Sequence, residues 1–136
     1  MCEKINITMT VQVVGGPQIS ESLTKLVEAY DKIQVTIAAN ASDKKVQVQP
    51  GCSGQVQLLM IRLTDSKHYG DGVTYKVNDG TAVNTLDAPQ VLMGKGGVKL
   101  LDPAPNKLFF TNTQTEDVSV EILVGRDATP KTETTP

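Results

Sequence analysis

Residues 5–13 of the chain read INITMTVQV, so that apolar and polar side chains alternate without a break. The same alternation returns near the C-terminal end, where residues 118–124 read VSVEILV. Because successive side chains of a β-strand point to opposite faces, this pattern makes one face of each strand apolar and the other polar. The sequence therefore predicts a β-sheet protein with its core on one side of each sheet.

Shorter runs of the same kind lie between these two segments and are separated by turn residues. Residues 33–37, 46–48 and 73–77 alternate, whereas residues 56–63 (VQLLMIRL) are apolar on both faces. A strand with two apolar faces is buried on both sides or carries a bulge that switches the inward side, so we expect residues 56–63 at the centre of the fold. Eight to ten short strands with closely spaced turn signals predict an all-β fold, a two-layer antiparallel β-sandwich that is jelly-roll-like and has at most one short helix.

One segment fits a helix as well as it fits a strand. Residues 20–30 place Leu23, Leu26, Val27 and Tyr30 at helical spacing, behind a serine that can serve as an N-cap. We therefore expect a helix at residues 20–30, with a strand as the alternative.

Strand pairings are expected from nearness in the sequence and from turn residues. Residues 33–37 and residues 46–48 should be neighbouring strands, because a short turn-like segment separates them. Asp79-Gly80 can supply the positive φ angles of a tight primed hairpin turn, so residues 73–78 should pair with residues 81–86.

The C-terminal third gives three further expectations. Pro89 cannot donate a hydrogen bond to a sheet, which makes residues 90–93 an edge strand or a loop. Residues 94–101 begin with GKGG and read as a flexible turn followed by a short strand. Residues 108–110 should pair with the final strand at residues 117–124.

The length and charge of the chain limit its class. A chain of 136 residues fits one domain, and we expect residues 1–128 to form a single sandwich domain with a short N-terminal arm. Residues 129–136 carry no apolar side chain and should be a disordered polar tail. The formal net charge of -2 argues against a nucleic-acid partner, because phosphate binding depends on clustered Lys and Arg.

The two cysteines and the apolar runs indicate in which compartment the protein is made and whether it meets a membrane. Cys2 and Cys52 do not make a disulfide framework in a chain of this length, so a reduced intracellular site of synthesis is the simpler interpretation. No apolar run approaches the ~20 residues that span a bilayer, and the N-terminal residues lead directly into a strand pattern. We therefore expect no membrane partner.

The residue types that carry chemistry are few and scattered. His68 is the only histidine, and it lies in a polar segment that reads as a solvated loop. Asp65, Asp71 and Asp79 lack the spacing of a calcium loop, and a zinc site needs three or four Cys or His ligands. The glycines at residues 94–97 lack the spacing of a phosphate-binding loop. We therefore expect no catalytic residue, no metal ligand and no cofactor.

Aromatic side chains are also scarce, since the chain has no Trp, three Tyr and two Phe. Tyr75, Phe109 and Phe110 lie in strand patterns, where core packing is their expected role. Tyr69 alone looks exposed. This shortage argues against binding of single-stranded nucleic acid by base stacking and leaves little surface on which a sugar could stack.

Three segments carry a resemblance to a known family: LDAPQVL at 86–92, NKLFFTN at 106–112 and VSVEILVGRD at 118–127. The chain resembles the small β-sandwich structural proteins of tailed-bacteriophage virions, in particular the jelly-roll decoration (cement) proteins of capsid shells. The resemblance implies a non-enzymatic structural protein that decorates and stabilises a viral capsid shell by clamping neighbouring capsid subunits. It also implies a location in the virion, after assembly in the host cytoplasm.

The implied partners are the major capsid protein or another virion protein, and further copies of the chain in a dimer or trimer. We expect contacts to such partners from exposed edges and loops, at Lys4, Tyr69, Gln90, Met93 and Arg126. Two other functions stay open. A carbohydrate-binding or adhesive module would present an exposed Tyr on a concave sheet face, and a cupin-like enzyme would need clustered metal ligands, for which one histidine is too few.

Overall fold

The computed structural model describes residues 3–48, 56–102 and 105–126. Ten β-strands dominate this part of the chain, together with one short α-helix, α1 (Gly94–Lys99), and a 3-10 turn, η1 (Ser66–His68). The expectations for Cys2, for Cys52 and for the tail at residues 129–136 lie outside the described residues.

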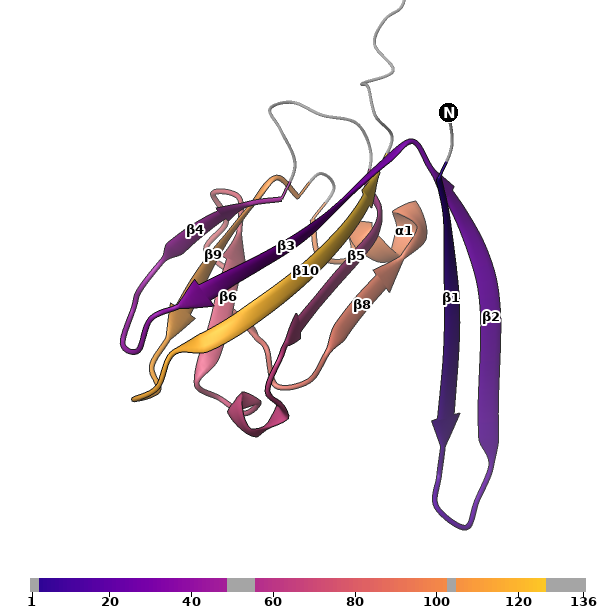
Figure 1. The fold of residues 1–136 in the computed structure, drawn as a ribbon, viewed down its shortest axis with the longest axis horizontal. Coiled ribbons are helices and arrows are strands. Elements are labelled where there is room, and N and C mark those ends of the chain that lie inside the picture. Colours follow the sequence, from indigo (N-terminus) through magenta and orange to yellow (C-terminus); the bar gives the residue numbers. More distant parts are fainter. Residues whose placement is uncertain (1–2, 49–55, 103–104, 127–136) are drawn as a thin grey trace, which may run out of the picture.

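Eight strands form two antiparallel sheets that pack face to face (Figure 1). The first sheet has the order β3-β10-β5-β8, and its strands are β3 (Ala29–Ile37), β10 (Val118–Arg126), β5 (Val56–Leu63) and β8 (Gln90–Met93). The second sheet has the order β4-β9-β6-β7, and its strands are β4 (Lys44–Gln47), β9 (Lys107–Asn112), β6 (Val73–Val77) and β7 (Asn84–Thr85). When these eight strands are renumbered along the chain, the two orders become 1-8-3-6 and 2-7-4-5, which is the strand order of a jelly roll. The predicted two-layer antiparallel sandwich is confirmed.

The core lies between the two sheets and is built from alternate side chains of each strand. In β10, Val120 and Ile122 are fully buried, as the alternation of the sequence predicts. From the second sheet, the rings of Tyr75 and Phe110 pack on each other with their centroids 5.6 Å apart, and both side chains are buried. The core role expected of these two aromatic residues is therefore confirmed, whereas the same expectation for Phe109 is wrong, because it points to the other side of β9 and is only half-buried.

Strand β5 lies inside the first sheet, between β10 and β8, and is buried on both faces. Leu59 belongs to the core between the sheets. Leu58 points to the opposite side of the sheet and is nevertheless only 2 % exposed. The pairing of β5 with β10 shifts register at Gly125 and Arg126, which marks a bulge. The predicted central position of residues 56–63 is confirmed, and both explanations for its two apolar faces apply.

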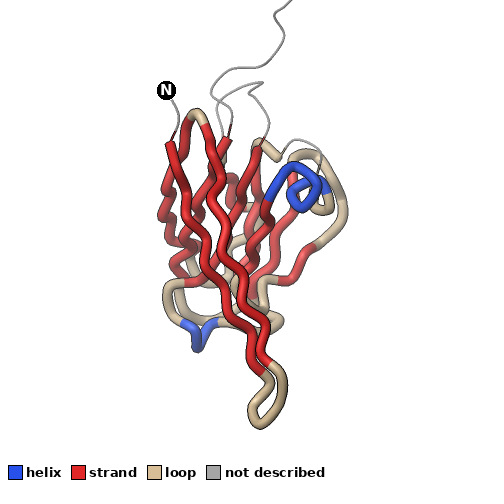
Figure 2. Tube along the Cα trace, turned by 90° about the vertical axis from the view of Figure 1, so that its right-hand side faces the viewer, coloured by secondary structure: helices blue, strands red, loops and turns tan. Residues whose placement is uncertain are grey.

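The remaining two strands form a separate hairpin that projects from the sandwich (Figure 1). Strand β1 (Glu3–Gln12) pairs with β2 (Gln18–Val27) from Glu3↔Val27 to Gln12↔Gln18. Figure 2 shows the hairpin in front of the sandwich, with its tip reaching beyond the end of the sandwich. The expected helix at residues 20–30 is wrong, because pairing along the whole of β1 favours the alternative strand in this segment.

Two predicted pairings between strands are also wrong. β3 and β4 lie in different sheets, and so do β9 and β10. In a jelly roll the chain crosses from one sheet to the other at these connections, so strands that are close in sequence face each other across the core instead of pairing. Alternation shows which face of a strand is buried and carries no information about its neighbour in the sheet.

The hairpin predicted from residues 73–78 and 81–86 forms only in part. β6 does pair with β7, but through Thr74↔Thr85 and Tyr75↔Asn84 alone. The positive φ in the connecting loop belongs to Asn78 (53°), so the predicted primed turn at Asp79-Gly80 is wrong.

The edge strand expected before the glycine-rich segment is confirmed, since β8 ends the first sheet. Residues 94–101 form α1 and the turn after it, not the expected turn and strand. Burial of Val98 at 2 % exposure anchors this helix to the core.

Candidate protein interface

The hairpin has two faces of opposite character, because residues that pair across antiparallel strands point to the same side. Its apolar face consists of odd-numbered positions on both strands: Ile5, Ile7, Met9, Val11, Ile19, Leu23 and Val27, together with Glu3, Glu21 and Lys25. Its polar face consists of even-numbered positions: Lys4, Asn6, Thr8, Thr10, Gln12, Gln18, Ser20, Ser22, Thr24 and the single apolar Leu26. On the polar face, the Thr24 hydroxyl donates to Asn6 Oδ1 at 2.8 Å.

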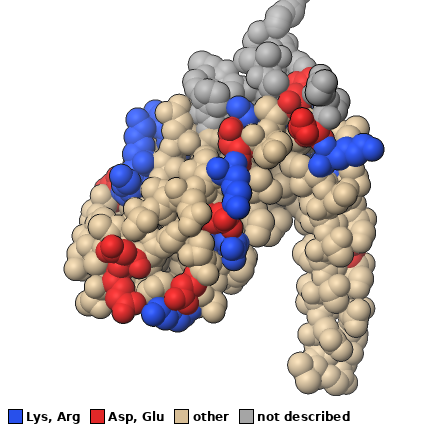
Figure 3. Space-filling view, viewed as in Figure 1, with Lys and Arg blue, Asp and Glu red and all other residues tan. Residues whose placement is uncertain are grey.

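Charge is sparse toward the tip of the hairpin. Glu3, Lys4 and Lys25 lie near its base, whereas residues 5–24 carry one charged side chain, that of Glu21. Figure 3 shows the projecting part of the hairpin with little charge and a gap between it and the sandwich. So few charges are unusual on a projecting strand pair, since exposed strand edges are commonly protected by Lys or other charged residues.

The base of the hairpin packs on the outer face of the first sheet at Gly125. A Cβ atom at this position would lie 2.9 Å from Ile5 Cδ1 and 3.1 Å from Val27 Cγ1, so glycine is what allows the close approach. Leu58 borders the same contact, which explains its burial on the side of the sheet away from the core. The apolar face of the hairpin therefore points toward the sandwich at this joint.

Beyond the joint the apolar face is uncovered. Val27 is 1 % exposed at the base, whereas Met9 is 37 %, Val11 58 % and Ile19 71 % exposed toward the tip. Exposure thus increases along one face of one element. The hairpin and the outer face of the first sheet enclose an open space, which we call the wedge.

The sheet wall of the wedge changes character with distance from the joint. Its strand registers place an apolar row next to the joint, formed by Tyr30, Gly125, Leu58 and Met93. The next row holds Lys32, Leu123, Met60 and Val91. Farther out come the polar residues Gln34, Glu121, Arg62, Thr36 and Ser119. At its mouth the wedge therefore has a polar wall on the sheet and an apolar wall on the hairpin.

The polar wall is organised around Glu121. Its carboxylate accepts a hydrogen bond from Arg62 Nε at 2.8 Å and lies 3.2 Å from Lys32 Nζ. The hydrogen bond from Arg62 and then that from Lys32 lower the pKa of Glu121 below its usual value. Two cations therefore share one carboxylate on this wall, which leaves the group of three with a net charge of +1.

A second uncovered surface, with an apolar rim and a partly polar lining, lies at the open edge of the sandwich. A cavity of about 500 Å³ there is lined by residues of β6, β7 and the loop before it, β8 and the turn after α1, among them Tyr75, Val83, Asn84, Gln90, Leu100 and Leu101. Val83 is 58 % and Leu100 86 % exposed. At the floor, the Tyr75 hydroxyl donates to Gln90 Oε1, and burial raises the pKa of Tyr75 to about 12. We call this surface the edge groove.

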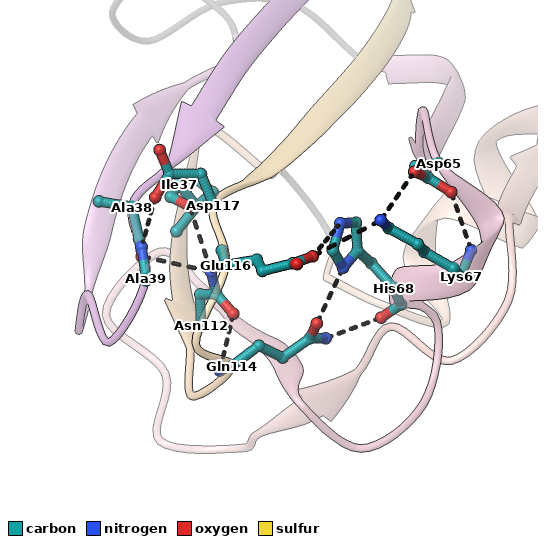
Figure 4. Close-up of polar contacts among 10 residues, drawn as sticks. All are labelled: Ile37, Ala38, Ala39, Asp65, Lys67, His68, Asn112, Gln114, Glu116 and Asp117. Carbon is teal, nitrogen blue, oxygen red and sulfur yellow. Dashed lines mark hydrogen bonds and ion pairs between the residues drawn. The ribbon is translucent and has the colours of Figure 1, made fainter.

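The segment around His68 is a structural clip (Figure 4). His68 is 8 % exposed, so the expected solvated loop is wrong for this side chain. Its Nδ1 lies 2.9 Å from Gln114 Oε1, and Gln114 Nε2 donates to the His68 carbonyl at 2.8 Å. His68 Nε2 also lies 3.7 Å from a Glu116 carboxylate oxygen. These contacts hold η1 against the turn between β9 and β10.

Next to this clip, the buried amide of Asn112 ties together the end of β3 and the β9–β10 turn (Figure 4). Its Nδ2 lies 3.2, 3.3 and 2.8 Å from the carbonyl oxygens of Ile37, Ala38 and Glu116, to which it donates. Its Oδ1 accepts from the Gln114 amide at 3.0 Å. One side chain from β9 of the second sheet thereby satisfies backbone groups at the end of β3 and in the β9–β10 turn.

The five residues predicted as partner contacts occupy different surroundings. Lys4 is exposed on the polar face of the hairpin, and Gln90 and Met93 are half-buried in β8. Tyr69 is half-buried against the core, and its hydroxyl bonds the Leu63 backbone, so the expectation that it is exposed is wrong. Arg126 is 9 % exposed and pairs with Asp31 at 3.2 Å. As partner contacts, these residues stay predictions.

The signal in the sequence that could have revealed the hairpin surface is the near absence of charge in residues 5–24, which contain no reactive group. In the described part of the chain, no three His, Cys, Asp or Glu side chains come together as a candidate metal site. No helix among the described residues is long and apolar enough to span a bilayer. Comparisons with protein family models, with curated proteins and with solved structures found no match.

Proposed function

We propose that this chain is a non-enzymatic structural protein that decorates and stabilises a viral capsid shell through protein–protein contacts. The observation that supports the proposal is that a complete sandwich core leaves apolar surface uncovered at two places, on the hairpin and in the edge groove. A molecule with two such surfaces can bind two protein neighbours at once. Linking neighbours is the task of a decoration protein.

The hairpin contributes little to the stability of a single copy. An isolated pair of strands is at best marginally stable in water, and its exposed apolar side chains gain stabilisation only when a partner covers them. Met9, Val11 and Ile19 are among the largest apolar side chains that the described residues expose. Full burial of one such side chain is worth roughly 1.5–3 kcal/mol, so a partner on this face would gain several kcal/mol.

The edge groove offers a second and different contact. Leu100 and Val83 form its exposed apolar rim, and β8 presents an unpaired strand edge beside it. Exposed strand edges bind other chains by adding a strand, with main-chain hydrogen bonds for affinity and side-chain pockets for specificity. Repetition over a closed shell would turn individually weak contacts into firm attachment.

The test is sedimentation of the purified protein with shells assembled from the major capsid protein encoded in the same genome. We expect the wild-type protein to pellet with shells and the variant Leu100→Asp to remain in the supernatant, because the new carboxylate would have to lose its water in the contact. Leu100 is 86 % exposed, so the substitution should leave the fold intact. A matched control is Asn40→Asp, in the exposed turn after β3 and outside both the wedge and the edge groove.

Two outcomes would contradict the proposal. Failure of the wild-type protein to pellet with shells at any concentration would reject the capsid role. Retention on a polysaccharide column in place of shell binding would support the carbohydrate-binding alternative. The melting temperatures of both variants, measured beside the wild type, separate loss of contact from loss of fold.

A further inference from the structure

The wedge between the hairpin and the first sheet sets strict conditions on whatever fills it. Its hairpin wall is apolar toward the mouth, with Met9, Val11 and Ile19 exposed. Its opposite wall is polar at the same depth, where the Glu121 network lies. An occupant must therefore be flat, apolar on one side and polar on the other, and free of charges that would lose their hydration.

In the described part of the chain, the hairpin itself comes nearest to these conditions. It is a two-stranded layer with an apolar and a polar face, and Glu21 is the one charged side chain in residues 5–24. Glu21 pairs with Met9 on the apolar face, and β2 is an outer strand of the pair, so its carboxylate must stay in water at the margin of the contact. Its polar face carries hydroxyl and amide groups, such as those of Thr10 and Ser20, which can hydrogen-bond to a polar wall. A layer of β-structure is about 10 Å thick, which is the scale of an opening between two β surfaces.

We propose that two copies of the chain clasp each other, each inserting its hairpin into the wedge of the other. The layers would then follow in the order sandwich, partner hairpin, own hairpin, partner sandwich. In this order the two apolar faces meet in the middle, and each polar face lies on the polar wall of the partner. The inference rests on the proposed function in taking the hairpin as a protein-binding element, and it names the partner of that element as a second copy.

Symmetry supports this arrangement. Each copy gives and receives the same contact, so the pair is a closed two-fold dimer and does not extend into a filament. The joint at Gly125 already directs the apolar face toward the wedge, so insertion needs no change in which way the hairpin faces. The edge groove stays free for the shell.

The buried area is at the lower limit for a specific dimer. The base of each hairpin already packs on its own sheet, so about six residues of each strand extend beyond the joint. This part is ~20 Å long and ~10 Å wide, which gives roughly 200 Å² per hairpin face. Each copy would bury both faces of this part and an equal area of its first sheet, or about 600 Å², and specific complexes bury upward of about 1,200 Å² in total.

Sedimentation velocity of the purified full chain tests the proposal. We expect a dimer in the micromolar range for the wild type and at least about 100-fold weaker association for the double variant Val11→Asp/Ile19→Asp, which places charges on the meeting apolar faces. These two residues pair directly and are exposed in one copy, so the sandwich should fold unchanged. Val83→Asp, in the edge groove, is the matched control and should remain dimeric.

A cross-linking measurement tests the layer order independently of folding in the double variant. In a background with Cys2→Ser and Cys52→Ser, Ser20→Cys protein is mixed with Gln34→Cys protein and treated with a short bismaleimide. The clasp places the polar face of one copy on the first sheet of the other, so the two variants should form a cross-linked heterodimer. Within one copy, Ser20 lies near the tip on the face opposite to the one that packs at Gly125, whereas the polar-face residues that line a pocket with the first sheet, Lys4 and Asn6, lie at the base.

Three results would overturn the clasp: a monomer at all concentrations, an undiminished dimer of the double variant, or no heterodimer on cross-linking. A monomeric wild type that still pellets with capsid shells would overturn the clasp and leave the proposed function standing. A clasped dimer that never pellets with shells would support the clasp and reject the capsid role.

Discussion

Replacing Asn112 by aspartate tests whether one buried amide holds the end of β3 to the β9–β10 turn through its hydrogen bonds. The side chain is fully buried, and its Nδ2 lies 2.8–3.3 Å from the carbonyl oxygens of Ile37, Ala38 and Glu116. The substitution keeps the volume and the acceptor for the Gln114 amide but exchanges the donor group for an oxygen.

The expected loss of stability follows from these contacts. Each buried carbonyl that loses its donor costs about 1–3 kcal/mol, and two protons are removed from the site. We therefore expect Asn112→Asp to lower the free energy of unfolding by roughly 3–5 kcal/mol at neutral pH, out of a typical total of about 5–15 kcal/mol. Asn112→Ala should lose about as much, because it also leaves these carbonyls and the Gln114 amide without a partner.

The pH dependence separates the two variants. A protonated carboxyl group can donate one hydrogen bond to a carbonyl, so its pKa in the folded Asn112→Asp variant would lie above the ~3.9 of the unfolded chain. The folded variant then binds more protons than the unfolded one, and its stability falls as the pH rises above about 4. The Asn112→Ala variant has no such group and should follow the pH dependence of the wild type.

Urea unfolding of both variants and the wild type at pH 4 and pH 8 measures these effects. The matched control is Asn6→Asp on the exposed polar face of the hairpin, where the carboxylate can still accept the hydrogen bond from Thr24. This control should stay within about 0.5 kcal/mol of the wild type. An Asn112→Asp variant as stable as the wild type at pH 8, or equally destabilised at both pH values, would refute the reasoning.

Three further predictions concern other parts of the molecule. Because burial raises the pKa of Tyr75 to about 12, spectrophotometric titration should find one tyrosine that ionises well above pH 10. The free energy of unfolding should then fall as the pH rises between about 10 and 12, and Tyr75→Phe should remove this fall. Since Arg62 and Lys32 lower the pKa of Glu121, its contribution is present above the unfolded pKa and is lost on acidification, so Glu121→Gln should flatten the decline in a series of acid melts. Gly125→Val should push Ile5 and Val27 off the sheet and make the hairpin sensitive to limited proteolysis, whereas Gly96→Ala, with nothing within 4 Å, should not.

The sequence was sufficient to predict strand positions and their buried faces, because side-chain alternation is local. Val120 and Ile122 face the core as their spacing predicts, and residues 56–63 occupy the centre of a sheet. Residues 20–30 were misassigned because spacings of three and four apolar positions fit a helix, while pairing to β1 depends on residues that lie earlier in the chain.

Partners of strands and of side chains could not be predicted in the same way. The apolar and polar side chains of β9 and β10 would alternate in the same way whether the two strands paired or faced each other across the core. Their sequences therefore do not distinguish the two arrangements. His68 is polar and lies in a polar segment, yet Gln114 from a distant turn buries it. The apolar face of the hairpin could be predicted from Ile5 to Val13, but its exposure could not, because exposure depends on where the sandwich lies.

A single residue, Glu28, separates β2 from β3. The hairpin is therefore joined to the sandwich by a one-residue hinge. At this hinge the Glu28 amide donates a hydrogen bond to the Arg126 carbonyl at 3.0 Å. With a tip ~30 Å from the hinge, a rotation of ten degrees there would displace the tip by about 5 Å. In the proposed clasp, such a rotation would change the spacing between the two sandwiches without repacking either core.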